Sequence, residues 1–211
     1  MVDIAVVDYG MGNLRSVQQA VRKVAPDASV SVTDDAKVIA AAKRVIFPGQ
    51  GAMPDCMREL EARKLRQTVL DAARNKPFLG ICIGLQMLFE HSAEGNVPGL
   101  GVLPGEVLRF ASELKDAQGN KLKVPHMGWN QVHHGNHALW DGIEQDARFY
   151  FVHSYYVRPR DASLVQATSD YPQPFVCAVA QGNLFAVQFH PEKSAAAGLR
   201  LLQNFINWNP L

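Results

Sequence analysis

The chain has 211 residues, 47% of them hydrophobic, and 21 basic side chains nearly balance 20 acidic ones to give a net charge of +1. This composition supports a sizeable core, and the near-zero charge provides no strong field to favour nucleic acid or an anionic membrane. No apolar run reaches the ~20 residues of a membrane span, and the start of the chain lacks the pattern of a signal peptide.

The first half of the chain alternates buried strands with helices. The expected strands are 4–7, 45–47 and 77–81. The expected helices run from Leu14 to before Pro26, over 54–75 with a break allowed, and onward from Cys82 with Leu85, Leu88 and Phe89 facing inward. Strands and helices that alternate at this spacing indicate βαβ units around a mostly parallel sheet.

The second half is richer in strands, and a helix closes it. The expected strands are 105–110, 148–152, 174–180 and 184–189, and the last two are joined by a hairpin at 181–183. The closing helix starts at Ser194, and no composition shift marks a domain boundary. We therefore predict one domain over 1–211, an α/β three-layer sandwich with a mostly parallel central sheet and an antiparallel, strand-rich second half.

Cys82 stands in the sequence Gly80-Ile81-Cys82-Ile83-Gly84, directly after an expected strand. Free cysteines are usually core residues, and that interpretation suits Cys56 and Cys177. Cys82, however, has the spacing of a nucleophile elbow, in which glycines let a strand turn sharply into a helix. The helix N-terminus there also favours a thiolate. We interpret Cys82 as a nucleophile.

His190 and Glu192 follow the end of another expected strand, in the stretch His-Pro-Glu. This stretch has an alternative interpretation as a simple turn before a helix. A carboxylate two residues away can nevertheless hold an imidazole in orientation, which is the arrangement of a catalytic triad. The sequence thus predicts that Cys82, His190 and Glu192 meet at one edge of the sheet. The three cysteines are far apart with no C-x-x-C pair, so we expect reduced thiols, no metal site, no cofactor and a cytoplasmic location.

Together, these two motifs resemble those of the class I (triad) glutamine amidotransferases, which release ammonia from glutamine. Three more stretches, 8–17, 47–57 and 125–132, are similar to the glutaminase subunit of imidazole glycerol phosphate synthase, and the likeness extends from the first strand to the last helix. The resemblance implies a flavodoxin-like fold and a Cys-His-Glu triad that hydrolyses L-glutamine. Gln50 departs from the family, which often carries valine there; the backbone supplies the donor, so we expect the role to survive.

The resemblance also implies roles for residues around the triad. The oxyanion hole would be formed by backbone N–H groups of Ile83 and of the segment with Gly49 and Gly51, although that segment taken alone is equally a turn. The residues expected to hold glutamine are Gln86, Glu94, Ser154 and Tyr155. Glu94 would meet the α-amino group, with an ordinary solvated carboxylate as its alternative interpretation.

A glutaminase of this length implies a separate subunit that receives the ammonia. By resemblance, this partner is a (β/α)8-barrel cyclase, in a heterodimer that forms imidazole glycerol phosphate and aminoimidazole carboxamide ribonucleotide. The candidate contact residues are Tyr9, Asn13, Ser16, Met127, Trp129, Asn130, Tyr150 and Lys193. Trp129 has an alternative interpretation as a core aromatic.

Three other functions remain open from the sequence. The chain could serve a different glutamine-dependent synthase, although the stretch 125–130 argues against this. It could be a stand-alone Cys-His γ-glutamyl hydrolase, which would leave the stretch 9–13 without a role. It could also be an inactive scaffold, against which the intact Cys82, His190 and Glu192 argue.

Overall fold

The structure is a computed structural model that describes residues 2–116 and 118–210. Its centre is a run of parallel strands in the order β2-β1-β3-β4-β14. Their bounds are β1 Ile4–Val7, β2 Val30–Thr33, β3 Arg44–Gly49, β4 Phe78–Cys82 and β14 Leu184–Val187. Because β4 and β14 pair in parallel, the segments after Cys82 and after Val187 emerge at the same edge of the sheet.

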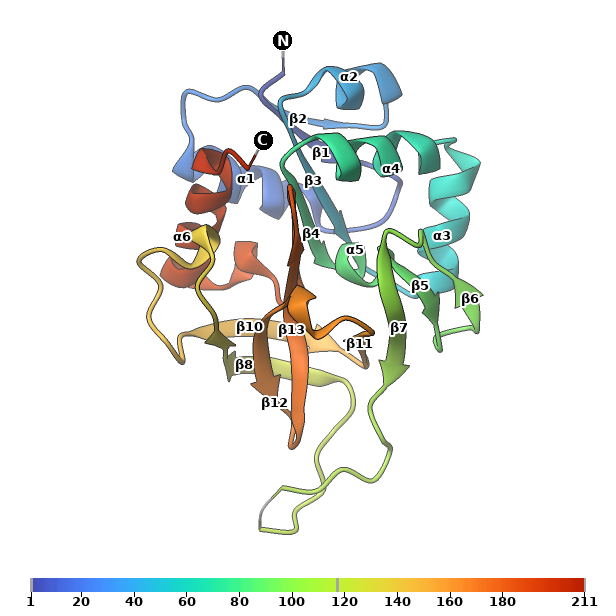
Figure 1. Ribbon diagram of the computed structural model, residues 1–211, viewed down its shortest axis with the longest axis vertical. Helices are drawn as coiled ribbons and strands as arrows, with labels where there is room; N and C mark the ends of the chain where they lie inside the picture. Colours follow the sequence, from blue (N-terminus) through green and yellow to red (C-terminus); the bar gives the residue numbers. More distant parts are fainter. Residues whose placement is uncertain (1, 117, 211) are drawn as a thin grey trace.

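Helices cover both faces of this parallel part (Figure 1). On one face lie α1 (Leu14–Val24) and α6 (Ala195–Asn207), and on the other lie α2 (Ala36–Ala41), α3 (Met53–Ala62) and α4 (Arg66–Asn75). Strand β1 is apolar throughout because both of its faces are buried. Ile4 and Val6 belong to one core cluster, and Ala5 and Val7 belong to the other. No helix among the described residues is long and apolar enough to cross a membrane.

The sheet continues into a mainly antiparallel half. The order is β14-β13-β11-β7-β5-β6, with β12 paired to β13 and β9 paired to β12. The bounds are β5 Phe89–Ser92, β6 Val97–Pro98, β7 Leu103–Arg109, β9 His133–His134, β11 Tyr155–Pro159, β12 Val165–Asp170 and β13 Pro174–Gln181. The short helical turns are α5 Ile83–Gln86, η1 Ala138–Trp140, η2 Ala162–Leu164 and η3 Pro191–Lys193.

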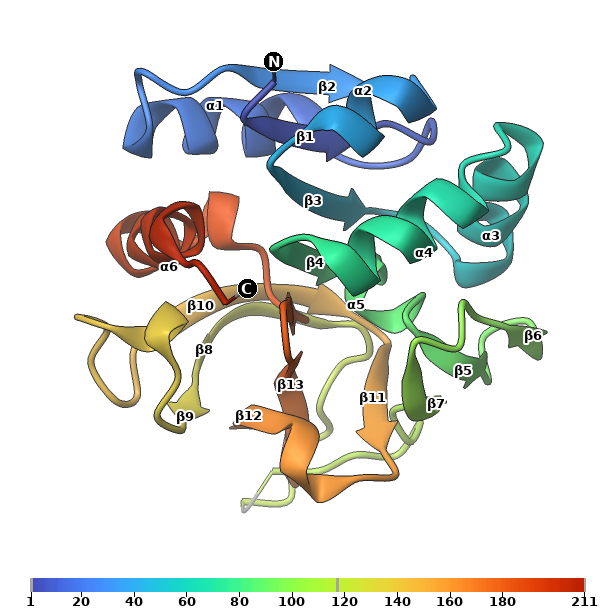
Figure 2. The ribbon, with the colours of Figure 1, turned by 45° about the horizontal axis from the view of Figure 1, so that its top comes forward.

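A second, two-stranded sheet consists of β8 (His126–Gln131) and β10 (Arg148–His153). Figure 2 shows these two strands side by side next to α6 and the antiparallel half. The inward residues Phe149 and Phe151 belong to the same core cluster as α1 and α6. This small sheet therefore forms a separate layer that reaches the end of the parallel strands.

The α/β class, the mostly parallel central sheet and the helices on both faces are confirmed. The sequence prediction missed β2, α2, β5, β6, β8, β9, β11 and β12. It was wrong about the helix after Cys82, which ends at Gln86 after one turn. Leu88 and Phe89 are buried as expected, but Phe89 begins β5, and the Leu88 carbonyl oxygen just before it accepts a hydrogen bond from the N–H of Leu103.

Candidate active site

Cys82 lies at a strained turn between β4 and α5. Its backbone has φ +56° and ψ −111°, in the positive-φ region that side chains other than glycine rarely adopt. Such strain persists only where the surrounding structure enforces it, and it is typical of functional sites. The predicted elbow is therefore present, and Cys82 stands at the carboxyl end of its strand.

Glycines on both sides of Cys82 make this turn sterically feasible. A Cβ on Gly84 would lie 1.9 Å from the carbonyl oxygen of Phe47 in β3. A Cβ on Gly80 would lie 3.0 Å from the Cβ of Ala186 and 3.1 Å from the carbonyl oxygen of Gly84. The short turn α5 thus packs directly on the backbone of the sheet, which only glycine at position 84 allows.

His190 and Glu192 lie in the turn that follows β14. The His190 Nδ1 and a Glu192 carboxylate oxygen are 2.8 Å apart, and both side chains are almost fully buried. The other ring nitrogen, Nε2, is buried and makes no hydrogen bond with the described residues. Because Glu192 occupies Nδ1, the Nε2 atom is the one left to act on a neighbouring group.

Ser194 fixes the backbone of this turn. Its hydroxyl donates to the carbonyl oxygen of His190 at 2.6 Å and accepts from the N–H of Tyr150 at 2.9 Å. The N–H of His190 in turn donates to the carbonyl oxygen of Tyr150 at 2.9 Å. The position of the imidazole therefore depends on β10 as well as on β14.

The charges around His190 favour its protonated form. Burial alone lowers the pKa of the imidazole, but the Cys82 sulfur and then the Glu192 carboxylate act in the opposite direction and raise it overall, to about 10. The imidazole is therefore suited to carry a proton at neutral pH.

Cys82 and His190 share a cavity of about 290 Å³. Its lining residues are Gln50, Gly51, Cys82, Ile83, Gln86, Glu94, Pro125, Val152, His153, Ser154, Tyr155 and His190. All four residues expected to hold glutamine are among them, as are Gly51 and Ile83. Gly49 is not: it is buried opposite Cys82 in the β3–β4 pairing, where a Cβ would lie 2.0 Å from the Tyr9 hydroxyl. This packing excludes a side chain at position 49, and the backbone role of Gly49 in the oxyanion hole stays a prediction.

Two of the lining polar groups are already oriented by the protein. Glu94 accepts a hydrogen bond at 2.8 Å from the N–H of Met53 at the start of α3, which leaves its second oxygen available. Gln86 donates from Nε2 to the carbonyl oxygen of Tyr155 at 3.2 Å and to Oε1 of Gln188 at 3.0 Å. Its own Oε1 has no partner among the described residues. Both side chains can therefore still accept hydrogen bonds.

Gln188 is a site residue that the sequence prediction missed. It is 0% exposed, and its Nε2 lies 3.8 Å from the Cys82 sulfur. The signal was present in the sequence, because an amide stands in the otherwise apolar stretch 184–189; in the structure Gln188 directly follows β14.

The predicted partner residues fall into two groups. Trp129, Tyr150 and Lys193 lie together: the two rings are 6.2 Å apart, and the ammonium is 5.9 Å from the Tyr150 ring centre. Met127 and Trp129 are the exposed large hydrophobic side chains of the described chain, at 62% and 49%. The interpretation of Trp129 as a core aromatic is therefore wrong.

The remaining predicted partner residues differ in their exposure. Asn13 and Ser16 are partly exposed at the start of α1, which packs against η3. Asn130 turns its amide inward, onto His126 at 3.2 Å and the carbonyl oxygen of Asp170 at 2.8 Å. Tyr9 is 0% exposed and packs against Phe47, so its assignment to a partner surface is corrected.

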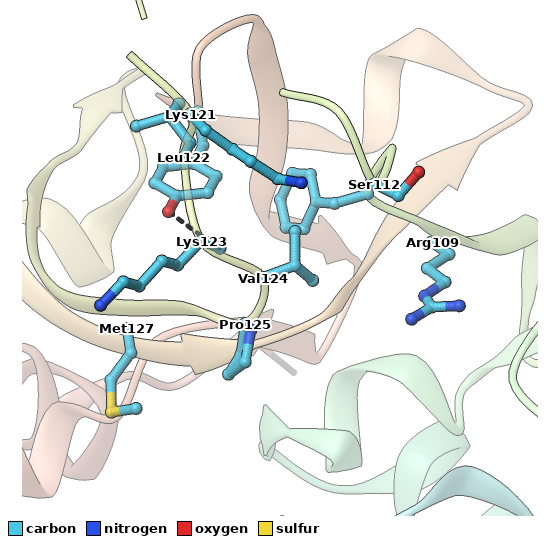
Figure 3. Close-up of a pocket in the computed structure, with 10 residues that line it drawn as sticks. Arg109, Ser112, Lys121, Leu122, Lys123, Val124, Pro125 and Met127 are labelled. Carbon is cyan, nitrogen blue, oxygen red and sulfur yellow. Dashed lines mark hydrogen bonds between the residues drawn. The ribbon is translucent and has the colours of Figure 1, made fainter. Parts of the chain in front are cut away.

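A second cavity, of about 910 Å³, lies beside the first and shares Pro125 with it (Figure 3). Its wall carries Arg109, Lys121 and Lys123 together with apolar groups. The dashed line in Figure 3 is the bond from the Tyr171 hydroxyl to the carbonyl oxygen of Lys123, at 2.6 Å. None of the described residues that line this space is a cysteine, a histidine or a carboxylate, so it is not the candidate reaction site.

The arrangement around Cys82 is that of an enzyme that attacks an acyl carbon through a cysteine sulfur. A family model and a solved structure are similar to this chain. The family model "Glutamine amidotransferase class-I" matches residues 5–208. In fold, the chain is similar to a putative GMP synthase subunit from Thermoplasma acidophilum, with a TM-score of 0.71 at 19% identity over 98% of this chain and 93% of that one.

Curated relatives are much more similar in sequence. The imidazole glycerol phosphate synthase subunit HisH of Aromatoleum aromaticum is 64% identical over 100% of both chains. The protein of the same name from Thiobacillus denitrificans is 65% identical over 99% of this chain and 92% of its own. The chain belongs to the class I glutamine amidotransferases and, within them, to the family of HisH subunits.

Proposed function

We propose that the chain is the glutaminase subunit of an imidazole glycerol phosphate synthase and that it hydrolyses L-glutamine to glutamate and ammonia at Cys82. The observation that carries this proposal is the shared cavity, in which a cysteine at positive φ stands beside a carboxylate-held histidine. Membership of the HisH family supports the choice of substrate.

In the proposed reaction, the Cys82 thiolate attacks the side-chain amide carbon of glutamine. The His190 imidazolium gives its proton to the nitrogen as the C–N bond breaks, so ammonia leaves and a γ-glutamyl thioester remains. His190, now neutral, takes a proton from water, which attacks the thioester and releases glutamate and the thiolate. Glu192 holds the ring and stabilises its charged form.

The other lining groups supply charge stabilisation and binding in this proposal. The N–H groups of Ile83 and Gly51 are the candidate oxyanion donors, each typically contributing about 10²–10³ in rate. Gln86 and Glu94 accept from the substrate through their available oxygens, and Glu94 meets the α-amino group. Ser154 and Tyr155 line the same cavity.

We further propose that a (β/α)8-barrel cyclase docks on the surface formed by Met127, Trp129, Tyr150 and Lys193. An exposed tryptophan and tyrosine with a nearby cation are typical anchors of protein interfaces. Ammonia released into water at neutral pH becomes ammonium, which is not a nucleophile. A direct handover would then let the complex form imidazole glycerol phosphate and aminoimidazole carboxamide ribonucleotide. The three free cysteines suit a reducing cytoplasm.

The test is glutamine hydrolysis by the isolated chain, by its complex with the cyclase, and by the complex with the cyclase's nucleotide ligand. We expect little hydrolysis by the chain alone and full turnover in the complex with ligand. Cys82→Ala should abolish glutamine-dependent synthesis while ammonium salts still support it. Full activity of the isolated chain would instead favour a stand-alone hydrolase, and normal hydrolysis by Cys82→Ala would exclude the assigned nucleophile.

A further inference from the structure

A continuous chain of hydrogen bonds leads from strand β8 to the Cys82 sulfur. Its outer half joins Asn130, His126 and His153, with contacts of 3.2 Å from Asn130 Nδ2 to His126 Nε2 and 2.9 Å from His126 Nδ1 to His153 Nε2. His153 Nδ1 then lies 2.7 Å from the carbonyl oxygen of Tyr155. We call this set, together with Gln86 and Gln188, the amide–imidazole chain.

In the outer half, only one assignment of hydrogens to the ring nitrogens of His126 and His153 satisfies every contact. A carbonyl oxygen accepts and never donates, so His153 must hold its hydrogen on Nδ1. His153 Nε2 is then an acceptor, which requires a hydrogen on His126 Nδ1, and His126 Nε2 accepts from the Asn130 amide. Burial lowers the pKa of His126 to about 4 and that of His153 to about 3, so both rings are neutral at pH 7.

The inner half is fixed in the same way. Gln86 donates from Nε2 both to the Tyr155 carbonyl oxygen and to Gln188 Oε1. If the Gln188 amide were reversed, its NH₂ group would face that of Gln86, donor against donor. Gln188 therefore presents its NH₂ to the Cys82 sulfur at 3.8 Å, where a donor stabilises the negative charge of an attacking sulfur.

The outer end lies directly under an exposed segment of the molecule. The Tyr171 ring stacks on the His126 ring, with centroids 4.1 Å apart, and its hydroxyl binds the carbonyl oxygen of Lys123. Figure 3 shows Lys123, Pro125 and Met127 along this segment, and Met127 is 62% exposed. Contacts made on Met127 or Trp129 would therefore bear on the strand that also holds His126 and Asn130.

We propose that Gln188 is a positioning residue for the Cys82 thiolate, and that the amide–imidazole chain transmits contacts made on β8 to that sulfur. The role of Gln188 depends on the geometry of this chain alone. The transmission depends in addition on the proposed function, in which the cyclase docks on β8. The two parts therefore need separate readouts.

The first experiment measures alkylation of Cys82 by iodoacetamide in the isolated chain, followed by peptide mass spectrometry. Gln188→Met keeps the length of the side chain but removes the donor, and we expect alkylation about 10- to 100-fold slower, the usual weight of a hydrogen bond to a charged group. Gln188→Glu retains the acceptor for Gln86 and puts a carboxylate against the sulfur, so its rate should be lower still.

Gln203→Met, on the exposed side of α6, is the matched control and should leave the rate unchanged. Thermal unfolding shows which variants are folded, and a folded Gln188→Glu suffices if Gln188→Met does not fold. A folded variant at position 188 that is alkylated within twofold of the wild-type rate would overturn the positioning role. Glutamine and the cyclase are absent from this assay, so a failure of the proposed function does not affect it.

The second experiment reverses the direction of hydrogen-bond donation at the outer end of the amide–imidazole chain. In Asn130→Asp, the carboxylate accepts a hydrogen bond from His126 while the Tyr155 carbonyl oxygen still accepts at the other end. One imidazole must then take up a second proton, or one bond must break. In protein labelled with ¹⁵N-histidine, we expect neutral Nδ1–H rings at positions 126 and 153 in the wild type and an imidazolium or Nε2–H signal in Asn130→Asp.

In the same variant, the altered contact at the Tyr155 carbonyl oxygen should slow Cys82 alkylation by about 2- to 30-fold, the usual size of coupling along a contact network, and glutamine hydrolysis by the complex should fall with it. Asn136→Asp, in an exposed loop, makes the same chemical change as a control. Nε2–H rings in the wild type, or altered rings in Asn130→Asp with alkylation unchanged, would overturn the transmission. A wild-type complex that does not hydrolyse glutamine would reject the proposed function and leave these two measurements interpretable.

Discussion

The two sides of the cavity hold their groups by different means. On the Cys82 side, the turn between β4 and α5 is fixed by close backbone contacts, which leave no space for a Cβ at Gly84. On the His190 side, the turn after β14 is fixed by polar contacts with Glu192, Ser194 and β10. The Cys82 side depends on glycine having no side chain, and the His190 side depends on hydrogen bonds.

This difference predicts which property a substitution will damage. A larger residue on the Cys82 side forces backbone apart and costs stability first. A lost polar group on the His190 side disturbs the position or charge of the imidazole, so it lowers activity whether or not it also lowers stability. The first three predictions below test that division, and the fourth tests β8.

The largest expected effect is on the His190 side. Glu192→Gln removes the charge that holds and stabilises the imidazolium, and a comparable loss in a triad lowers kcat by about 10⁴. Steady-state glutamine hydrolysis by the complex measures it, with Glu144→Gln on the surface as the control. A loss below tenfold would show that the carboxylate is not essential to this side.

Next is the Cys82 side. Gly84→Ala places a Cβ 1.9 Å from the Phe47 carbonyl oxygen, so the elbow must shift, and overpacking of this kind costs roughly 1–3 kcal/mol or more in the free energy of unfolding. Gly135→Ala is the matched control, because its Cβ would meet only the Gln166 carbonyl oxygen at 3.7 Å. Urea denaturation of both variants makes the comparison. Equal stabilities would mean that the elbow is not sterically fixed.

The Cys82 side could be predicted from sequence because its determinants are local. A buried strand, two glycines and a short helical turn are adjacent in the chain, and the turn follows from their order. The length of the helix could not be predicted, because Leu85, Leu88 and Phe89 fit a helix face equally well. Tertiary pairing of Phe89 with Leu103 of β7 decided that β5 begins there.

The His190 side was only half predictable. His190 and Glu192 are two residues apart, so their contact could be expected from the sequence. The contacts of Ser194 with Tyr150, and of His126 with His153, join segments whose pairing depends on the β8–β10 register. Nothing in the polar stretch around Trp129 indicated that it would be a strand, because its apolar and polar residues do not alternate in a clear pattern.

A smaller effect is expected for Ser194→Ala. The substitution leaves the N–H of Tyr150 without its partner, at a cost of about 1–3 kcal/mol in unfolding free energy, while the His190 carbonyl oxygen keeps only its bond from the N–H of Lys193. Because the lost bonds also set the His190 backbone, kcat should fall about 10-fold or more while KM changes little. Ser163→Ala, on an exposed turn, is the control. Unchanged kcat in a destabilised Ser194→Ala would mean that β10 does not position the imidazole.

The smallest expected effect is on the pH dependence of the unfolding free energy. It tests His126 in β8, which belongs to neither side of the cavity. Burial lowers the pKa of His126 to about 4, below the unfolded value of about 6.5. Between these values the unfolded chain binds more protons than the folded chain, so stability falls as the pH falls. Each such histidine contributes a slope of about 1.4 kcal/mol per pH unit. His126→Asn should therefore reduce the slope between pH 6 and 4.5 by about that amount in urea denaturation, and leave it flat near pH 7.5. An unchanged slope would mean that His126 is protonated in the folded chain, which would also contradict the proton order of the amide–imidazole chain.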